Sequence, residues 1–509
     1  MRTLYRNGRL YRHAVRDETA MLVDGAMIVW TGHERDVEAP RDVRVVDLAG
    51  ALVTPAFVDA HVHTTSTGLS LTGLDLSGAL SLADALSMIE RVARIGRGRP
   101  VLGGGWDDTH WPERRPPTAR ELDRAGYGGL IYLARVDAHS AVVSSAVLAT
   151  VPGLAQLAGY RADGHLTRAA HDAARTATLG AMSAAQTSEL QRLALRHAAS
   201  LGIACVHEMA GPAISSEADL AGLLALARTE PLPEVIGYWG ELFGVETARD
   251  LGAVGAAGDL FCDGSFGSHT AALHEPYTDL PDSHGMLRFS TDEVAEHLVR
   301  CTEVGLQAGF HAIGDAAVDQ VLDAVELAGE RLGRPVGSEH RLEHAEYVRD
   351  PSRLAASGLT ASVQPVFDAE WAGAGGMYEA RLGRERTRAL NPFAAMSAAG
   401  VPLALGSDAP VTALGPWAAV RAAVHPHEPS HGLDPATAFA AHTAGGWAAA
   451  RRSGGRLDAG TPATFAIWQV DNLGADSGLP DLRAALPRCL ATVRDGAAIF
   501  DSGLLDGSA

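Results

Sequence analysis

The chain contains no lysine, so all 42 of its Lys and Arg positions are arginine, against 61 acidic side chains. This absence excludes any site that depends on a lysine side chain, a carbamylated lysine included. The net charge of −19 also argues against a nucleic-acid partner, because an acidic surface repels phosphates. We therefore expect a small-molecule substrate and no nucleic acid.

Cysteine is scarce as well, and its four positions are scattered without any C-x-x-C pair: Cys205, Cys262, Cys301 and Cys489. Neither a disulfide framework nor a thiolate zinc site is indicated, which fits a reducing cytoplasm. The start, MRTLYRNGRLYRHAVRDE, is too polar for a signal peptide. No apolar run reaches membrane-spanning length, so we expect a cytoplasmic protein without a membrane partner.

The composition that remains is globular, and 509 residues exceed a single ordinary core. The two ends of the chain look alike. Asn-Gly or Asp-Gly turns separate short strand-like runs in TLYRNGRLY, AMLVDGAMIVWTG and LATVRDGAAIFDSG. This pattern predicts one small β-sandwich built from both termini, residues 1–54 and 457–509.

The middle of the chain, residues 55–456, alternates short apolar runs with amphipathic helical stretches. Examples are LGIACVHE, VPLALGSDAP, and GLQAGFHAIGD followed by AAVDQVLDAVELAGERLG. Such βα units around a parallel sheet predict an α/β fold, a (β/α)₈ TIM-like barrel at this length. An irregular stretch at about 68–165 is interpreted as a lid-like insertion over the barrel mouth, where such barrels keep their active sites.

Two histidines close the first barrel strand in AFVDAHVH. Side chains alternate faces along a strand, so His61 and His63 point the same way, with Val62 opposite. Two imidazoles on one face are a natural half of a metal site. Alone the motif is weak, because most short His-x-His pairs are incidental.

Three more apolar runs end in a metal-ligand residue type. His311 closes GLQAGFH, His344 closes HRLEH, and Asp408 closes LALGSD. Each lies at a predicted strand-to-helix junction, which is the catalytic rim of such a barrel. Singly, each could be a helix N-cap or a satisfied core polar group, and Asp408 before Ala409-Pro410 suits a cap well. Together with the His pair, they favour a divalent metal site.

The sequence resembles the amidohydrolase superfamily, in the family 3 branch that contains N-substituted formamide deformylase. The resemblance runs nearly end to end, although Ala56 stands where glycine is usual. It rests on blocks in the expected order: VTPAFVDAHVH, GWDDTHWPERRPPT, RVDAHSAVV, DGSFGSHTA, FHAIGDAAV, RLEHAE, SVQP and LGSDAPV. The family implies a (β/α)₈ barrel with a β-sandwich from both termini.

The resemblance also implies roles. His61 and His63 would hold the more buried metal, and His311 and His344 would ligate the same ion or a second one. Asp408 would contact the metal, accept the proton of the attacking water and pass it to the leaving amine. The metal would lower the pKa of that water and polarise the scissile carbonyl.

Substrate contacts are predicted in two further blocks. The insertion supplies Trp106, Asp107, Trp111 and His139, and packing of the lid is an equal alternative for the tryptophans. His269, in GSHTA, stands where relatives often carry arginine, and it either contacts substrate or faces solvent. The pair Arg341 and Glu343 falls on the strand face opposite His344, so we expect a structural pair there.

Many relatives bridge two metals with a carbamylated lysine on the fourth strand, which this chain cannot do. Asp259, in GDLFCDGSFGSHTA, occupies the corresponding place, but its side chain is much shorter and its strand would have to move inward. Glu208 is a longer candidate at the end of the preceding strand. Cys262 could bridge as a thiolate, but strand alternation places it opposite Asp259. We therefore expect one tightly held ion.

The expected function is metal-dependent hydrolysis of a carbon–nitrogen bond in a small N-acyl or N-formyl compound. Zinc is the expected metal, although imidazole and carboxylate suit Fe and Mn equally. The same site could serve a cyclic imide, a deamination or an ester, and a barrel without catalysis could act as a scaffold. A scaffold has no reason to keep a full ligand set. The sequence leaves the oligomeric state open, a homodimer included.

Overall fold

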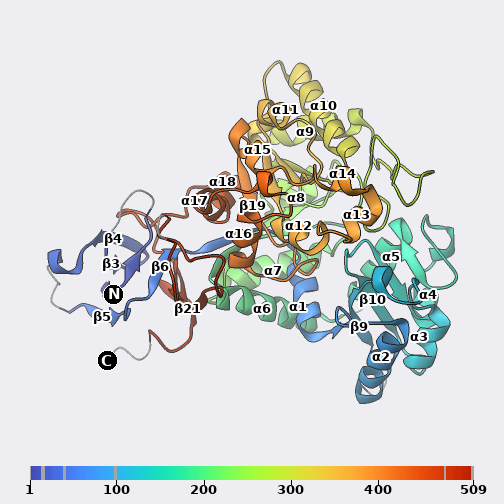
Figure 1. Cartoon of the computed structure of the whole chain (residues 1–509), viewed down its shortest axis with the longest axis horizontal. Coiled ribbons are helices and arrows are strands. Elements are labelled where there is room, and N and C mark those ends of the chain that lie inside the picture. The colour runs from blue at the N-terminus through green and yellow to red at the C-terminus, as the bar shows by residue number, and fades with distance from the viewer. Residues whose placement is uncertain are drawn as a thin grey trace.

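The computed structural model describes residues 2–12, 18–37, 42–96, 100–180, 182–474 and 477–505. Three parts are visible in Figure 1: a central barrel, a small β domain at the end where both termini lie, and an α/β layer on the opposite side.

Eight parallel strands form the barrel sheet in the order β19-β18-β17-β16-β15-β14-β13-β7. Their bounds are β7 (Phe57–Val62), β13 (Ile203–Ala210), β14 (Glu234–Trp239), β15 (Gly255–Ala256), β16 (Gln307–Ala312), β17 (Arg341–His344), β18 (Thr360–Val363) and β19 (Leu403–Leu405). Val62 bridges to Ala409, and the Asp408 N–H donates to the His61 carbonyl at 2.8 Å. The edge strands thus nearly close the sheet, and the predicted TIM-like barrel is confirmed.

Strands β7, β13 and β16 are buried along their whole length, and β14 and β18 have a partly exposed residue only at the start, as expected for parallel strands with covered faces. Helices cover the outside; in α9, Ser290 and Glu293 form a capping box at the start, and Gly305 ends the helix at φ 75°. The helices of the barrel part of the chain are α1 (Thr64–Thr72), α6 (Ala184–Ser200), α7 (Glu217–Thr229), α8 (Val245–Leu251), α9 (Thr291–Val304), α10 (Asp315–Leu332), α11 (Pro351–Ser357), α12 (Pro365–Trp371), α13 (Met377–Leu382), α14 (Arg384–Thr387), α15 (Phe393–Ala399), α16 (Pro416–Val424), α17 (Pro435–Ala441) and α18 (Ala444–Ala449). Short 3₁₀ turns are η1 (Glu34–Asp36), η2 (Asp108–His110), η3 (Leu154–Gln156), η4 (Gly337–Glu339) and η5 (Pro429–His431).

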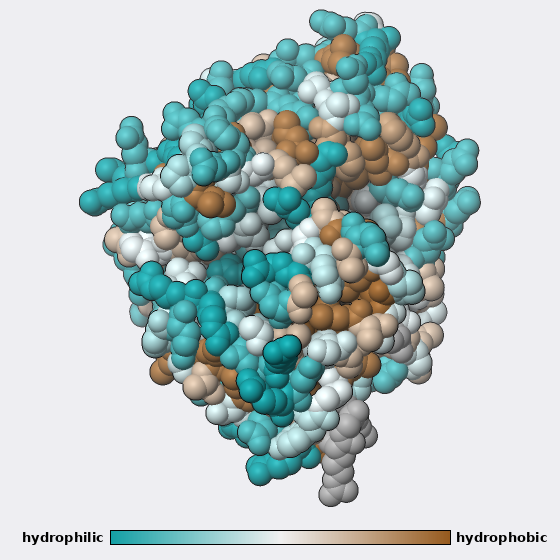
Figure 2. Space-filling view, turned by 90° about the vertical axis from the view of Figure 1, so that its right-hand side faces the viewer, coloured by the Kyte–Doolittle hydropathy of each residue, from teal (hydrophilic) through white to brown (hydrophobic). Residues whose placement is uncertain are grey.

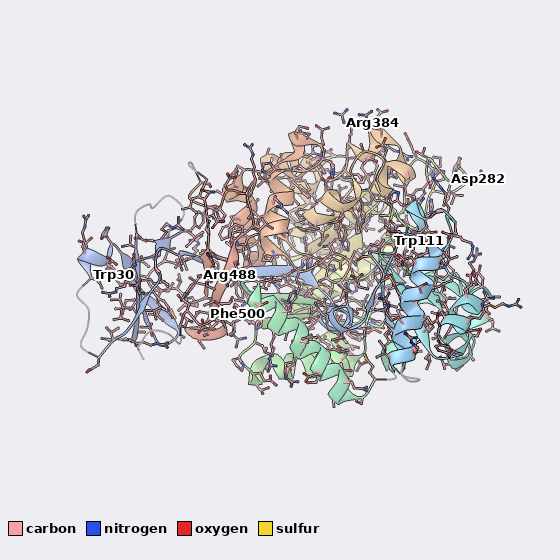
Figure 3. The ribbon with its side chains drawn as sticks, turned by 60° about the horizontal axis from the view of Figure 1, so that its bottom comes forward. Trp30, Trp111, Asp282, Arg384, Arg488 and Phe500 are labelled. Atoms are coloured by element: carbon pink, nitrogen blue, oxygen red, sulfur yellow. The ribbon has the colours of Figure 1, made fainter. Side chains whose placement is uncertain are left out.

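The terminal domain consists of two mixed sheets, of which one joins both ends of the chain. The first has the order β4-β3-β1-β5, from β1 (Arg2–Arg6), β3 (Ala20–Asp24), β4 (Met27–Gly32) and β5 (Arg44–Asp47). The second has the order β2-β6-β20-β21-β22, from β2 (Arg9–Leu10), β6 (Leu52–Pro55), β20 (Phe465–Gln469), β21 (Arg488–Arg494) and β22 (Ala497–Asp501). Tyr5 packs edge-on against Phe465 at 5.2 Å between the sheets. Trp30, Arg488 and Phe500 accordingly lie in the same half of the molecule in Figure 3, with Trp30 the farthest from the barrel.

The stretch that the sequence marks only as irregular forms an ordered α/β layer. Its sheet has the order β12-β11-β10-β9-β8, from β8 (Leu74–Asp75), β9 (Val101–Trp106), β10 (Ile131–Arg135), β11 (Ser140–Val143) and β12 (His165–Thr167). Its helices are α2 (Leu82–Gly96), α3 (Ala119–Ala125), α4 (Ser145–Thr150) and α5 (Arg168–Gly180). The glycines of β9 give it no alternation of apolar and polar side chains that would predict a strand. A Cβ at Gly103 would lie 2.1 Å from the Leu74 carbonyl oxygen. The glycines therefore allow β8 and β9 to approach closely.

Figure 2 shows the end of the molecule that carries this layer, where hydrophilic residues cover most of the surface and hydrophobic patches are scattered. Across the ranges that the structure describes, no helix is both long and apolar enough to cross a membrane.

Candidate metal centre

Six buried side chains with metal-ligand chemistry meet at the carboxyl ends of barrel strands. One each lies on β7, β16 and β17, and one each follows β7, β15 and β19: His61, His311, His344, His63, Asp259 and Asp408. The structure thus brings together the five ligands predicted from the sequence and the first candidate for a bridging residue.

An oxygen acceptor orients each of the four imidazoles from one side of its ring. The pairs are His61 Nδ1 with Glu343 Oε2 at 3.0 Å, His63 Nδ1 with the Met209 carbonyl at 3.1 Å, His344 Nδ1 with Gln364 Oε1 at 2.8 Å, and His311 Nε2 with the Gly264 carbonyl at 3.2 Å. An N–H donated on that side leaves the other ring nitrogen as a lone-pair ligand, which is the usual support of metal-binding histidines.

The Asp259 carboxylate lies among these free ring nitrogens. Its Oδ1 is 3.5 Å from His61 Nε2, 3.4 Å from His311 Nδ1 and 3.5 Å from His344 Nε2. Its Oδ2 is 3.1 Å from His63 Nε2. Asp408 Oδ1 approaches the same region, at 3.0 Å from His63 Nε2.

Five atoms that point into this space are buried and have no hydrogen-bond partner: His61 Nε2, His311 Nδ1, His344 Nε2, Asp259 Oδ1 and Asp408 Oδ1. Buried polar atoms rarely stay unpaired, because the lost hydration is costly. Ligand atoms within 4.8 Å of one another form three groups: His61–His63–Asp259, His61–His344–Asp408 and Asp259–His311–His344. The residues present therefore fit a divalent metal, which would satisfy these atoms.

The segment that carries Asp259 packs closely against its neighbours at two glycines. Strand β15 ends at Ala256, and the chain then turns through Gly258 at φ 99°. A Cβ at Gly258 would lie 2.8 Å from the Met209 sulfur, and one at Gly240 would lie 3.0 Å from the Asp259 carbonyl carbon. The two glycines thus permit the close approach that a short aspartate side chain requires.

The charges of the site favour a bound cation. Burial raises the pKa of Asp259, but His61, His311 and His344 outweigh burial and hold that pKa well below its usual value. Burial likewise raises the pKa of Asp408, while His61 and His63 bring it below the usual value. Both carboxylates are therefore anionic at neutral pH, with only imidazoles around them.

Asp408 is held by its backbone and does not cap a helix. Its N–H donates to the His61 carbonyl, and the next helix, α16, begins at Pro416. Asp408 adopts a left-handed φ of 54°, a conformation that costs energy for a residue other than glycine and that clusters at functional sites. Asp408 therefore does not form the helix N-cap that the sequence left open as an alternative.

Glu343 has a role that the sequence did not reveal. It forms the expected buried pair with Arg341, whose Nε donates at 2.7 Å, and it also orients His61. The expectation that Glu343 and His344 face opposite sides overlooked the end of the strand. His344 has a φ of 70°, so strand alternation stops there and both side chains reach the metal centre.

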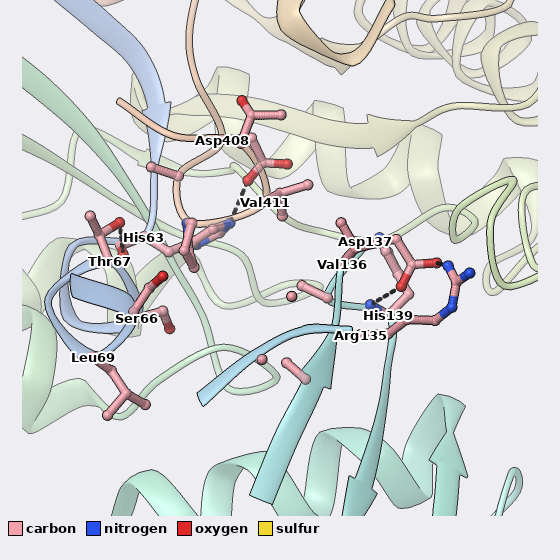
Figure 4. A pocket seen from close by; sticks show the side chains of 18 of the residues that line it. His63, Ser66, Thr67, Leu69, Arg135, Val136, Asp137, His139, Asp408 and Val411 are labelled. Carbon is pink, nitrogen blue, oxygen red and sulfur yellow. Dashed lines mark hydrogen bonds and ion pairs between the residues drawn. The ribbon is translucent and has the colours of Figure 1, made fainter. Parts of the chain in front are cut away.

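A cavity of about 480 Å³ opens from the metal centre toward the inserted layer. The barrel contributes His63, Asp259, His311 and Asp408 to its wall, and the layer contributes the segment 134–139. Figure 4 shows His63 and Asp408 on one side of this space and Arg135, Asp137 and His139 on the other.

The predicted lid contacts occupy different places. His139 lines the cavity, with its ring 5.4 Å from that of His311, and burial lowers its pKa to about 3. Asp107 accepts a hydrogen bond from Arg135 at 2.6 Å and does not itself line the cavity. The indoles of Trp106 and Trp111 donate to the carbonyls of Leu133 and Ala79 inside the layer.

His269, Glu208 and Cys262 do not join the candidate ligands found in the described ranges. His269 pairs with Asp279 at 2.9 Å. Glu208 Oε2 accepts the Thr64 N–H at 2.7 Å, and burial raises the pKa of Glu208 to about 7. Burial also raises the pKa of the Cys262 thiol well above its usual value.

A sequence model described as the amidohydrolase family matches residues 44–500. The chain belongs to the amidohydrolase family. The fold and the arrangement of ligands at the strand ends agree with the resemblance stated above.

Relatives with known names or structures extend the match over most of the chain. It is 26% identical over 510 residues to N-substituted formamide deformylase of Arthrobacter pascens, covering 90% of this chain and 91% of that protein. It is 27% identical to a metal-dependent hydrolase of Pyrococcus horikoshii, with a TM-score of 0.75, covering 93% and 98% of the chains. A metal-dependent hydrolase of Pyrococcus furiosus is also 27% identical, with a TM-score of 0.73 and coverage of 92% and 98%. These likenesses support a metal-dependent hydrolase.

Proposed function

We propose that this chain hydrolyses a carbon–nitrogen bond of a small N-acyl or N-formyl compound. The observation that supports this most is the convergence of five buried, unpartnered ligand atoms beside a cavity. The likeness to a formamide deformylase supports the choice of bond.

A bound divalent metal would polarise the scissile carbonyl and lower the pKa of a coordinated water. His61, His63, His311, His344 and Asp259 would provide the ligands of the metal site, and the outer partners of the four histidines fix the imidazoles in the required tautomers. Asp408 lies beside His63 and lines the cavity. Its carboxylate takes the proton of the attacking water and returns it to the leaving amine.

The position of Asp259 supports two ions rather than one. The single-ion expectation rested on the lack of a placed bridging ligand, and Asp259 offers one oxygen to His63 and the other to His311 and His344. We propose that this carboxylate would serve in place of a carbamylated lysine as a ligand common to both ions, with zinc as the expected metal.

Hydrolysis can be tested with purified protein, a panel of N-formyl and N-acyl amines, and detection of the released amine. We expect release that stops after chelation and returns with Zn²⁺ or Mn²⁺. Full activity of the metal-free protein would contradict the mechanism. Release of ammonia from amino-pyrimidines or amino-purines, with no amide hydrolysis, would instead favour deamination.

A further inference from the structure

Two arginines on the cavity wall share a single carboxylate. Arg175 and Asp172 lie one turn apart on α5, and Arg288 Nη1 is 3.5 Å from Asp172 Oδ2. All three line the cavity. Burial raises the pKa of Asp172, but the adjacent His171 and then the two guanidinium groups outweigh burial and bring that pKa to about 2. This part of the wall therefore carries one uncompensated positive charge.

The donors of both arginines are mostly unused within the described residues. A guanidinium group has five N–H donors. Arg288 makes only the long contact to Asp172, and its other neighbour is the Phe261 ring, 4.9 Å from Cζ. Arg175 donates through Nη2 to the Ala213 carbonyl, and its Nε is buried without a partner.

Arg135, a third arginine on the same cavity, differs from Arg175 and Arg288 because its charge is fully paired. Three carboxylates surround it, those of Asp107, Asp108 and Asp137, at 2.6, 3.5 and 3.2 Å. Its charge is compensated inside the protein, so it has a structural task. The other anionic groups on the cavity wall outside the metal centre, Asp75 and Glu370, are exposed, and neither is paired with Arg175 or Arg288.

Arg288 is also close to the metal centre. Its guanidinium lies over Phe261, and the Phe261 ring is 4.8 Å from the His311 ring. The Arg288 N–H donates to the Cys262 carbonyl, which ties its backbone to the segment that carries Asp259. One aromatic side chain thus separates the arginine from a metal ligand, a span that an amide with an acid group a few bonds away would fill.

We propose that Arg288, assisted by Arg175, binds a carboxylate of the substrate, so that the enzyme acts on N-acyl or N-formyl compounds that carry an acid group. This inference rests on the proposed hydrolysis. A planar guanidinium matches a carboxylate through two parallel hydrogen bonds. Apolar residues such as Ile214, Val411 and Leu414 line other parts of the cavity and suit an apolar substituent.

The test compares two substrates that differ only in the acid group, N-formylphenylalanine and N-formylphenethylamine. Wild-type enzyme should prefer the acid. Arg288→Gln should lower kcat/KM for the acid about tenfold or more, the effect of losing a charge-assisted hydrogen bond, and should change the neutral substrate less than twofold. Arg175→Gln should act in the same direction. The exposed Arg384→Gln on α14 is the control and should leave the ratio unchanged.

A second measurement needs no turnover: calorimetric binding of phenylacetate to the metal-loaded protein. We expect binding that weakens about tenfold or more in Arg288→Gln at an unchanged metal content. Equal binding by both proteins, or equal loss on both substrates, would overturn the acid site. If phenylacetate binding depends on Arg288 but no amide is hydrolysed, the acid site stands and the proposed function fails.

Discussion

Glu343 accepts a hydrogen bond from His61 Nδ1 at 3.0 Å, on the side of the ring that faces away from Asp259 and Asp408. The same carboxylate receives two hydrogen bonds from Arg341, at 2.7 and 3.0 Å. A wholly buried ion pair therefore determines which nitrogen of His61 is free to bind a metal.

Glu343→Gln should weaken metal binding about 10- to 100-fold, the usual effect of removing an outer partner of a metal ligand. It should also lower the melting temperature, because Arg341 is left buried without its counter-ion. Gln364→Leu is the matched variant, since it frees His344 Nδ1 and leaves no buried charge. Chelator competition measures the metal affinity of both variants, and a thermal melt measures their stability. Unchanged affinity in the two variants would show that these partners do not support the ligands.

Asp408→Asn should lower turnover by about two to four orders of magnitude, the usual contribution of a general acid–base group. The fold should survive, because the backbone N–H of residue 408 keeps its bond to the His61 carbonyl. Kinetics on the best amide and a thermal melt check the two statements. Near-normal turnover would remove Asp408 from the proton transfer.

Phe465→Ala should destabilise the terminal domain by about 3–5 kcal/mol, because a fully buried ring leaves a cavity. Phe465 belongs to the C-terminal strand β20 but packs on Tyr5 of β1. Limited proteolysis should therefore open the N-terminal strands as well. Phe500→Ala, at a partly exposed position, should cost less. Cleavage confined to the C-terminal segment would mean that the two ends fold separately.

The charge of Asp172 makes the free energy of unfolding depend on pH in the acid range. Its pKa is about 2 in the folded protein against a usual 3.8, so the folded state favours the charged form. The resulting stabilisation, about 2 kcal/mol, is complete above pH 3.8 and is lost as the pH falls through 2. Asp172→Asn should therefore be less stable than wild type at pH 7, with about half of that difference at pH 3. Denaturant unfolding at both pH values checks this, and a difference independent of pH would refute it.

The sequence predicted the barrel and the convergence of the candidate ligands because both depend on local patterns. His61 and His63 share a strand face, and His311, His344 and Asp408 each end an apolar run. Such residues converge in any closed parallel barrel, since the carboxyl ends of the strands meet at one rim.

The rest depends on how distant segments pack. Asp259 looked too short to reach the centre, because nothing local shows that Gly240 and Gly258 let its segment pack closely against its neighbours. Glu343 was expected on the strand face opposite His344, and this part of the expectation failed because the left-handed His344 ends the alternation. The sequence marked the insertion at about 68–165 but did not show its sheet, because β8 has only two residues and β9 contains three glycines in a row. Gln364 stood in a block of the family resemblance, SVQP, but only the fold shows that it orients His344.

Metal content per chain is the most direct test of the central claim, measured by mass spectrometry on protein purified from metal-supplemented cells. The account predicts about two divalent ions in wild type and in Glu208→Gln, whose buried carboxylate points to Thr64. Asp259→Asn should lose at least one ion, and wild type loaded with Mn²⁺ should show a spin-coupled pair that the variant lacks. One ion or none in wild type, or an Asp259→Asn protein with the full complement and the same coupling, would contradict the role assigned to Asp259.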